Sequence, residues 1–249
     1  MSERATIEID GHVMVITMTR HEKRNAIDGE MTSALDEALN RLDDDPDLWV
    51  GIITGGPDMF CAGTDMAATS GSPTERGGVY GVVGRTRTKP LIAAVEGVAF
   101  GGGFEVVMAC DMVVAAENAR FGLPEVKWGL YPFGGAAAKL ATQIGYVHAM
   151  NLLLTAENID ANEALRVGLV NELLPAEDLM DRALATAGLI AANSPMAVQA
   201  VKQFVSSGLA EQVHRREARE QELGDAVRAS ADFREGIAAF RERREPDYK

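Results

Sequence analysis

Cysteine is scarce in this chain: Cys61 and Cys110 are the only two among 249 residues. Two cysteines cannot build the disulfide framework of a small secreted protein, and a chain of this length does not need one. We therefore expect both to be free, buried, small apolar residues in a reducing compartment.

Long apolar runs and excess positive charge are also missing. No stretch approaches about 18 uninterrupted apolar residues, the length of a membrane-spanning helix, and the opening "MSERATIEID" lacks the apolar segment of a secretory signal. The 24 basic and 37 acidic residues give a net charge of −13, which disfavours a nucleic acid or an anionic membrane as partner. We expect a soluble cytoplasmic protein with neither of these partners, although a small anionic ligand could still bind in a local basic pocket.

Several catalytic signatures are absent as well. The four histidines are scattered and there is no H-E-x-x-H or C-x-x-C, so no metal site is expected. The G-x-S-x-G elbow of serine hydrolases and the glycine-rich loops that cradle phosphates are missing too.

What the chain does contain is an alternation of strand and helix patterns, with 47% apolar residues for a core. A helix is expected after the N-cap Asp28, and helices dominate from Ala161 onward, with new starts at Ser194-Pro195 and Ser230. The Gly/Ser/Pro-rich stretch 68–78 is expected to be a mobile loop. Strands are expected at 5–9, 12–18, 49–55, 90–97 and 111–116, with an extended piece at 59–66. This order predicts the α/β class.

Two glycine turns carry the candidate chemistry. Gly101 to Gly103 stand directly before a predicted helix, where bare N–H groups and the helix dipole can stabilise an oxyanion. The same glycines could simply allow close helix–strand packing, with Glu105 complementing the helix dipole. The turn "FCAGTDM" could supply a second free N–H group at Thr64. Glu125 follows a proline in a third stretch, where an acid is more often a first-turn residue than a catalyst.

Together these stretches resemble the enoyl-CoA hydratase/isomerase (crotonase) superfamily, in order and over nearly the whole chain. The resemblance implies a spiral of ββα units at 1–193 with the acyl-CoA site, and a helical assembly region at 194–249 that packs homotrimers, commonly paired into hexamers. The matching motifs are "HEKRNAI" (21–27), "FCAGTDM" (60–66), "AFGGGFEVVMACDMVVA" (99–115), "FGLPEVKWGLYP" (121–132), "LLLTAENIDANEALRVGLVNELLP" (152–175) and "EGIAAFRERREPDY" (235–248).

The resemblance also implies a function. It implies an enoyl-CoA hydratase, a hydro-lyase that adds water in syn fashion to the 2,3 double bond of a 2-enoyl-CoA, without a separate cofactor because coenzyme A is part of the substrate. Glu105 would be the base that activates water, and Glu125 the proton donor to the α-carbon. The N–H groups of Thr64 and Gly102 would form the oxyanion hole. An isomerase, another hydroxyacyl-CoA dehydratase or a non-catalytic acyl-CoA-binding protein stay open as alternatives.

Further residues are carried over as contacts of coenzyme A or the acyl group. Phe133 stands where many hydratases have glycine, which indicates a reshaped acyl pocket. For Arg243 the alternative is an ordinary solvated helix end. The expected contacts are Lys23, Arg24, Ala26, Ala62, Gly63, Asp65, Met66, Gly101, Tyr131, Phe133, Phe240 and Arg243.

Overall fold

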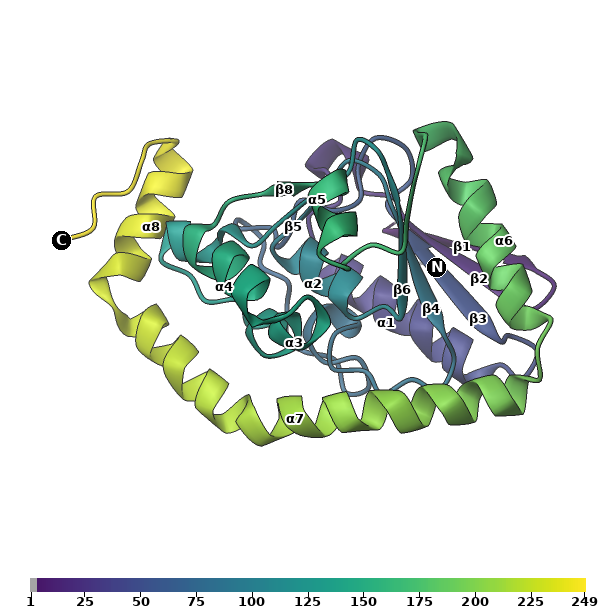
Figure 1. Ribbon diagram of the computed structural model, residues 1–249. Coiled ribbons are helices and arrows are strands. Elements are labelled where there is room, and N and C mark those ends of the chain that lie inside the picture. The colour runs from purple at the N-terminus through teal and green to yellow at the C-terminus, as the bar shows by residue number, and fades with distance from the viewer. Residues whose placement is uncertain (1–3) are drawn as a thin grey trace.

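The computed structural model describes residues 4–249 and, within them, every side chain except those at 212 and 217. Its centre is a six-stranded sheet in the order β1-β2-β3-β4-β6-β9, with β1 antiparallel to β2 and the other neighbours parallel (Figure 1). The strands are β1 (Ala5–Asp10), β2 (Val13–Met18), β3 (Val50–Thr54), β4 (Leu91–Val95), β6 (Met112–Ala116) and β9 (Glu172–Leu174).

A second, three-stranded sheet has the order β5-β7-β8, formed by β5 (Val98–Phe100), β7 (Arg120–Gly122) and β8 (Ile159–Asp160). Two successive turns of the chain visit both sheets. The chain passes from β4 to β5 and then into α2 (Gly102–Met108), and from β6 to β7 and then into the short 3-10 helix η3 (Pro124–Trp128). This is the spiral of ββα units that the resemblance implies.

The centre of the large sheet is buried on both faces. All residues of β3 and β4 are buried, as expected for central parallel strands. Helix α1 (Gly29–Asp44) packs on one face, where Leu35 and Leu39 share a core cluster with Ile16 of β2. Helix α6 (Leu179–Ala191) covers the other face over alternate strand residues. Asp28 is the N-cap of α1, accepting a hydrogen bond from the Met31 N–H at 2.8 Å.

The second half of the described chain is mainly helical. Helix α7 (Pro195–Ala229) runs along one side of the core, and α8 (Ala231–Glu242) stands at the end opposite α6 (Figure 1). Ser194 and Ser230 cap α7 and α8 through their side chains, as predicted. The helices are α3 (Ala136–Gln143), α4 (Tyr146–Thr155), α5 (Ala161–Arg166), α7 (Pro195–Ala229) and α8 (Ala231–Glu242), with 3-10 turns η1 (His21–Lys23), η2 (Val79–Gly81) and η4 (Ala176–Asp178).

No single helix of the described residues is both long and apolar enough to cross a membrane. Only residues 176–191 and 195–216 taken together would meet that requirement, and these two helices are bent by 104°.

Three local predictions have clear outcomes. Both cysteines are free, and Cys61 is buried as predicted whereas Cys110 is half-buried; removal from water raises the pKa of each thiol to about 12. The extended piece at 59–66 forms only isolated bridges, Cys61 with Ala99 and Thr64 with Ile27. The expected loop at 68–78 differs from a free loop, because from Thr74 onward its side chains are bonded to α1: Thr74 Oγ1 donates to Asp36 at 2.7 Å.

Candidate active site

Three segments that run parallel to one another converge on one place: residues 59–66, β5 and β7. Cys61 pairs with Ala99, and Ala99 pairs with Phe121, so the three segments run side by side in register. Thr64 and Gly102 each follow three residues after their paired position, and Glu125 follows four residues after Phe121. Because parallel segments end at the same edge, this register brings together residues from three successive turns of the spiral.

Two backbone N–H groups at this edge are free to bind a ligand. Among the described residues, neither the Thr64 N–H nor the Gly102 N–H donates a hydrogen bond, while the neighbouring Asp65 N–H donates to the Ile27 carbonyl at 3.0 Å. The two turns adjoin, since a Cβ on Gly63 would lie 3.6 Å from the Gly102 nitrogen. An oxygen placed between them could accept from both, which is the arrangement of an oxyanion hole.

Glu105 lies in α2, one turn after these glycines, and is 1% exposed. Gly134 leaves the space for its carboxyl, since a Cβ there would lie 2.4 Å from Cδ of Glu105. The Tyr80 hydroxyl donates to Oε2 at 3.3 Å and the Ala136 N–H donates to Oε1 at 3.4 Å. Burial, and next the charge of Glu125, raise the pKa of Glu105 to about 8, while these donors oppose the rise.

Glu125 lies in η3, directly after Pro124 at the helix start. A Cβ on Gly101 would lie 3.1 Å from its Oε1, and among the described residues its buried Oε2 finds no hydrogen-bond donor. Burial raises the pKa of Glu125 to about 7. Two neighbouring carboxyls with raised pKa values titrate as a pair, so near neutral pH the pair holds about one proton.

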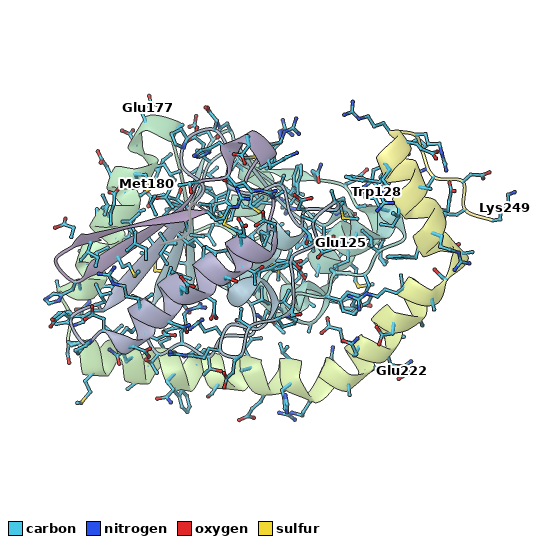
Figure 2. The ribbon with its side chains drawn as sticks, turned by 180° about the vertical axis from the view of Figure 1, so that it is seen from behind. Glu125, Trp128, Glu177, Met180, Glu222 and Lys249 are labelled. Atoms are coloured by element: carbon cyan, nitrogen blue, oxygen red, sulfur yellow. The ribbon has the colours of Figure 1, made fainter. Side chains whose placement is uncertain are left out.

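Both carboxylates and both amides line one cavity of about 630 Å³, within the size range of small-ligand sites. The C-terminal helices of the same chain form part of its wall. Trp128 of η3 meets Phe240 of α8 edge to face at 5.2 Å, and Figure 2 shows Glu125 and Trp128 on the side of the core that faces α8. From the tail, Arg228, Phe233, Ile237, Phe240 and Arg241 line the cavity.

The expected substrate contacts divide into two groups. Besides the catalytic candidates, the cavity is lined by Ala62, Gly63, Asp65, Met66, Gly101, Tyr131, Phe133 and Phe240. Asp65 has a second task, because its carboxylate bonds the Arg20 guanidinium at 2.8 Å and accepts from the Ala67 and Ala68 N–H groups. These backbone donors, with Arg20, lower the pKa of Asp65.

Lys23, Arg24, Ala26 and Arg243 do not line the cavity. Lys23 and Arg24 are exposed, yet their segment lies against the cavity wall, because the Ala62 N–H donates to the Arg24 carbonyl at 3.0 Å. Ala26 already donates its N–H to the Lys23 carbonyl and accepts at its own carbonyl from Arg20. Arg243 is the C-cap of α8 in a left-handed conformation, and it is Arg241 that reaches the cavity.

Phe133, the departure from the usual glycine, packs against the tail. Its ring meets Tyr131 edge to face at 5.4 Å and lies under the Arg228 guanidinium at 3.8 Å. A Cβ on Gly224 of α7 would lie 2.0 Å from the ring, so a glycine in the tail makes room for this phenylalanine.

The sequence reasoning missed several lining residues, among them Tyr80, Trp128, Arg228 and Arg241. The tail residues carry no local signal, because their role depends on where α7 and α8 pack. Tyr80 had one weak signal, an aromatic residue inside the glycine-rich run "GGVYGVVG". As for metals, the described residues hold no group of three or more His, Cys, Asp or Glu that could bind an ion.

Several known proteins are similar to this chain over nearly its whole length. Enoyl-CoA hydratase EchA19 of Mycobacterium tuberculosis is 40% identical, covering 98% of this chain and 96% of its own. The (E)-benzylidenesuccinyl-CoA hydratase of Thauera aromatica is 38% identical, covering 98% of both chains. The crystal structure of a carnitinyl-CoA hydratase from Mycobacterium avium superposes with a TM-score of 0.94 at 37% identity, covering 99% of this chain and 98% of that one.

The sequence profile of the enoyl-CoA hydratase/isomerase family matches residues 8–249, which is nearly the whole chain. The match therefore includes the two glycine turns, both glutamates and the helical tail. This chain belongs to the enoyl-CoA hydratase/isomerase family.

Proposed function

We propose that this protein is an enoyl-CoA hydratase that adds water to the 2,3 double bond of a 2-enoyl-CoA thioester. The observation that carries the proposal is the pairing, in one cavity, of two unpaired backbone N–H groups with two buried carboxyls of raised pKa. Hydration of a conjugated thioester needs both parts: donors for the charge that develops on the carbonyl oxygen, and one base with one acid for the elements of water.

In the proposed reaction, the thioester oxygen accepts hydrogen bonds from the Thr64 and Gly102 N–H groups. Glu105 takes a proton from water as the water oxygen bonds to the β-carbon, and the π electrons move onto the thioester as an enolate. Glu125 then gives its proton to the α-carbon, and the carbonyl re-forms. One water has been added, and a proton passed from Glu105 to Glu125 restores the pair.

The roles of the two glutamates are assigned from their hydrogen bonds. Glu105 is more deeply buried than Glu125, which favours the shared proton on Glu105. The Tyr80 hydroxyl and the Ala136 N–H, however, both donate to Glu105 and favour its carboxylate form. We follow the donors, because they act directly at the oxygens that must receive the proton of water. Glu125, whose buried Oε2 lacks a donor among the described residues, suits the protonated partner. No cofactor enters this scheme, since coenzyme A arrives as part of the substrate.

We further propose that the coenzyme A part of the bound substrate extends out of the cavity along residues 23–26. Lys23 and Arg24 would then offset its phosphates, against a net charge of −13, from a segment hydrogen-bonded to the cavity wall at Ala62. Arg243 stays a candidate contact at the end of α8. The acyl group would meet Tyr131 and Phe133, whose rings narrow this part of the cavity.

The chain is also proposed to act as a homotrimer, with trimers pairing into hexamers through a helical region at 194–249. Helix α7 exposes an apolar stripe of Met196, Val201, Phe204 and Val205, each at least 67% exposed. Val201, Phe204 and Val205 have the spacing of one helix face. Exposed apolar stripes of this kind mark protein interfaces. The cytoplasmic location expected from the sequence stays a prediction.

A panel of 2-enoyl-CoA esters of different chain length and substituents tests the function. Turnover is followed by loss of absorbance of the conjugated double bond. We expect hydration of at least one ester, and a loss of about 10²–10⁴-fold in kcat for either Glu105→Gln or Glu125→Gln. An isomerase would instead move the double bond of a 3-enoyl-CoA and could keep activity with one of the two variants. Binding of the esters without any turnover would refute the proposal.

A further inference from the structure

Tyr80 touches both halves of the candidate site. Its hydroxyl lies 2.9 Å from Thr64 Oγ1 and donates to Glu105 Oε2 at 3.3 Å. The tip of its ring lies over the start of α2, since a Cβ on Gly102 would lie 2.6 Å from Cζ. Tyr80 thus joins the residue of one candidate oxyanion donor to the candidate base.

The direction of these hydrogen bonds follows from charge. Tyr80 is buried, and burial, followed by the charge of Glu105, raises the pKa of its hydroxyl well above 10. The phenol therefore keeps its proton, and an ionised carboxylate can only accept. The hydrogen bonds then run in series: the Thr64 hydroxyl donates to the Tyr80 hydroxyl, which donates to Glu105 Oε2. The second of these bonds favours the charged form of Glu105.

The backbone of Tyr80 is held in an unusual conformation. Its φ of 59° and ψ of 8° lie in the left-handed region, which costs an aromatic residue free energy and persists only where surrounding contacts enforce it. Such outliers cluster at functional sites.

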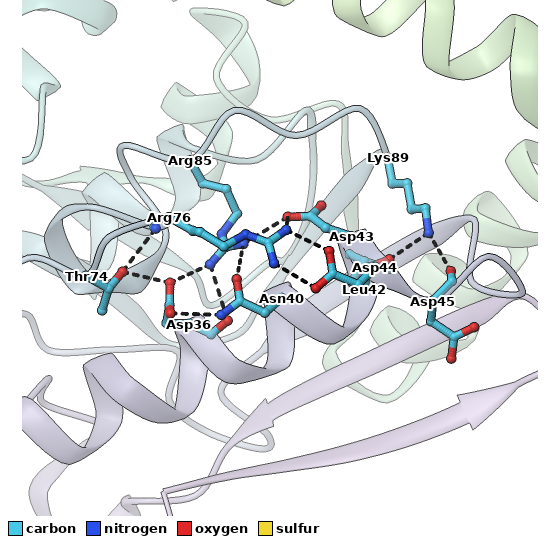
Figure 3. Close-up of polar contacts among 11 residues, drawn as sticks. Asp36, Asn40, Leu42, Asp43, Asp44, Asp45, Thr74, Arg76, Arg85 and Lys89 are labelled. Carbon is cyan, nitrogen blue, oxygen red and sulfur yellow. Dashed lines mark hydrogen bonds and ion pairs between the residues drawn. The ribbon is translucent and has the colours of Figure 1, made fainter.

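Contacts on both sides of Tyr80 enforce it here. Arg85, whose side chain is 1% exposed, binds Asp36 and Asp43 of α1, and Thr74 binds Asp36 from the other side of Tyr80 (Figure 3). From α3, Lys139 Nζ donates to the Val83 carbonyl at 3.1 Å. The segment is therefore fastened to α1 before and after Tyr80, and to α3 after it.

We propose that Tyr80 is a positioning residue for Glu105: its hydroxyl holds this carboxyl charged and fixed in direction for its role as base. The role of Glu105 as base rests on the proposed function. The titratable groups that face Glu105 are Glu125 from η3, Tyr80 from η2, Lys139 from α3 and Tyr131 from the segment before α3. Of these, Tyr80 is the group hydrogen-bonded to Glu105 through its side chain among the described residues.

Tyr80→Phe tests the proposal because it removes only the hydroxyl. We expect the acid limb of the pH profile of kcat/KM to move up by about one pH unit, the size of one lost hydrogen bond to a charged group. At pH values below this limb, kcat of Tyr80→Phe should be about tenfold lower than that of the wild-type protein, and it should recover at higher pH. KM should change by less than about twofold. Tyr146→Phe, at a tyrosine 68% exposed, is the matched control and leaves the profile unchanged.

Packing alone would have a different signature. If the ring merely fills space, Tyr80→Phe keeps the acid limb of the wild-type protein, and that result overturns the proposal. Thr64→Val retains the backbone N–H but removes the hydroxyl that begins the series of hydrogen bonds to Glu105. It should move the acid limb in the same direction by a smaller amount.

A second readout does not depend on activity. In protein labelled with ¹³C at glutamate carboxyls, the Glu105 signal is identified by its loss in Glu105→Gln and titrated by NMR. Tyr80→Phe should raise the pKa of Glu105, and an unchanged value refutes the positioning role. If no 2-enoyl-CoA is hydrated by the wild-type protein, the proposed function fails, while this titration still decides the role of Tyr80.

Discussion

Gly134 offers the sharpest test of how closely the site is built. A methyl group placed there would lie 2.4 Å from Cδ and Oε2 of Glu105, whereas ordinary contact begins at 3.4 Å. In Gly134→Ala the carboxyl must therefore move by about 1 Å, a misplacement that can cost about 10²-fold in rate. Because the displaced atoms are the end of a flexible side chain, the fold should tolerate the change with little loss of stability.

The assay compares kcat for the fastest 2-enoyl-CoA substrate with the melting temperature followed by circular dichroism. We expect Gly134→Ala to lose about 10²-fold in kcat, equivalent to about 2.7 kcal/mol of transition-state stabilisation, while it melts close to wild type. The control is Gly188→Ala in α6, where an added Cβ has no neighbour within 4 Å. It should keep full activity and gain up to about 1 kcal/mol in stability. A folded Gly134→Ala protein with wild-type kcat would refute the reasoning.

Three further predictions concern the glutamates and Arg85. The group that protonates the α-carbon also removes that proton in the reverse reaction. In D₂O, Glu125→Gln should therefore abolish exchange of the α-hydrogen of a saturated acyl-CoA, as followed by NMR, while Glu105→Gln should retain it. The opposite pattern would exchange the roles of the two glutamates. Because the pKa values of both glutamates are raised above 4.5 in the folded protein and the pair shares about one proton near neutral pH, stability should fall as pH rises from about 5 to about 9. Glu105→Gln should then melt above wild type at about pH 9 and lose this advantage at about pH 5, and an advantage independent of pH would contradict the raised value. Arg85→Met removes the buried ion-pair partner of two half-buried aspartates, Asp36 and Asp43, and should cost about 3 kcal/mol in urea unfolding. Arg76→Met, at an arginine 44% exposed, should cost less than about 1 kcal/mol. Equal losses would rule out the buried ion pairs as the cause.

Much of the fold could be predicted from local sequence because local physics produces it. Asp28, Ser194 and Ser230 start helices as predicted, since their side chains satisfy N–H groups that a helix leaves unpaired. The apolar runs of β3 and β4 mark buried central strands. The bonding of the stretch 68–78 could not be predicted, because the hydrogen bond from Thr74 and the ion pair of Arg76 that fasten its end to α1 join residues more than thirty positions apart in sequence.

The candidate site was only partly predictable. Glu105, Glu125, Thr64 and Gly102 stood out by motif, and the structure brings all four to one cavity. Tyr80, Arg228 and Arg241 did not stand out, because nothing local to them indicates which surface they will meet. Lys23 and Arg24 lie outside the cavity, where the Arg24 carbonyl bonds the cavity wall at Ala62, and their contact with coenzyme A stays a prediction.

By itself, then, the sequence determined which chemical groups exist and where strands, turns and caps begin. Such features depend on a few neighbouring residues. Tertiary structure decided the properties that make those groups reactive. The register of Cys61, Ala99 and Phe121 brings three turns together. Burial inside the resulting cavity raises the pKa values of both glutamates, because removing a carboxylate from water disfavours its charge. No local pattern encodes either property, since both arise from segments that meet only when the chain has folded.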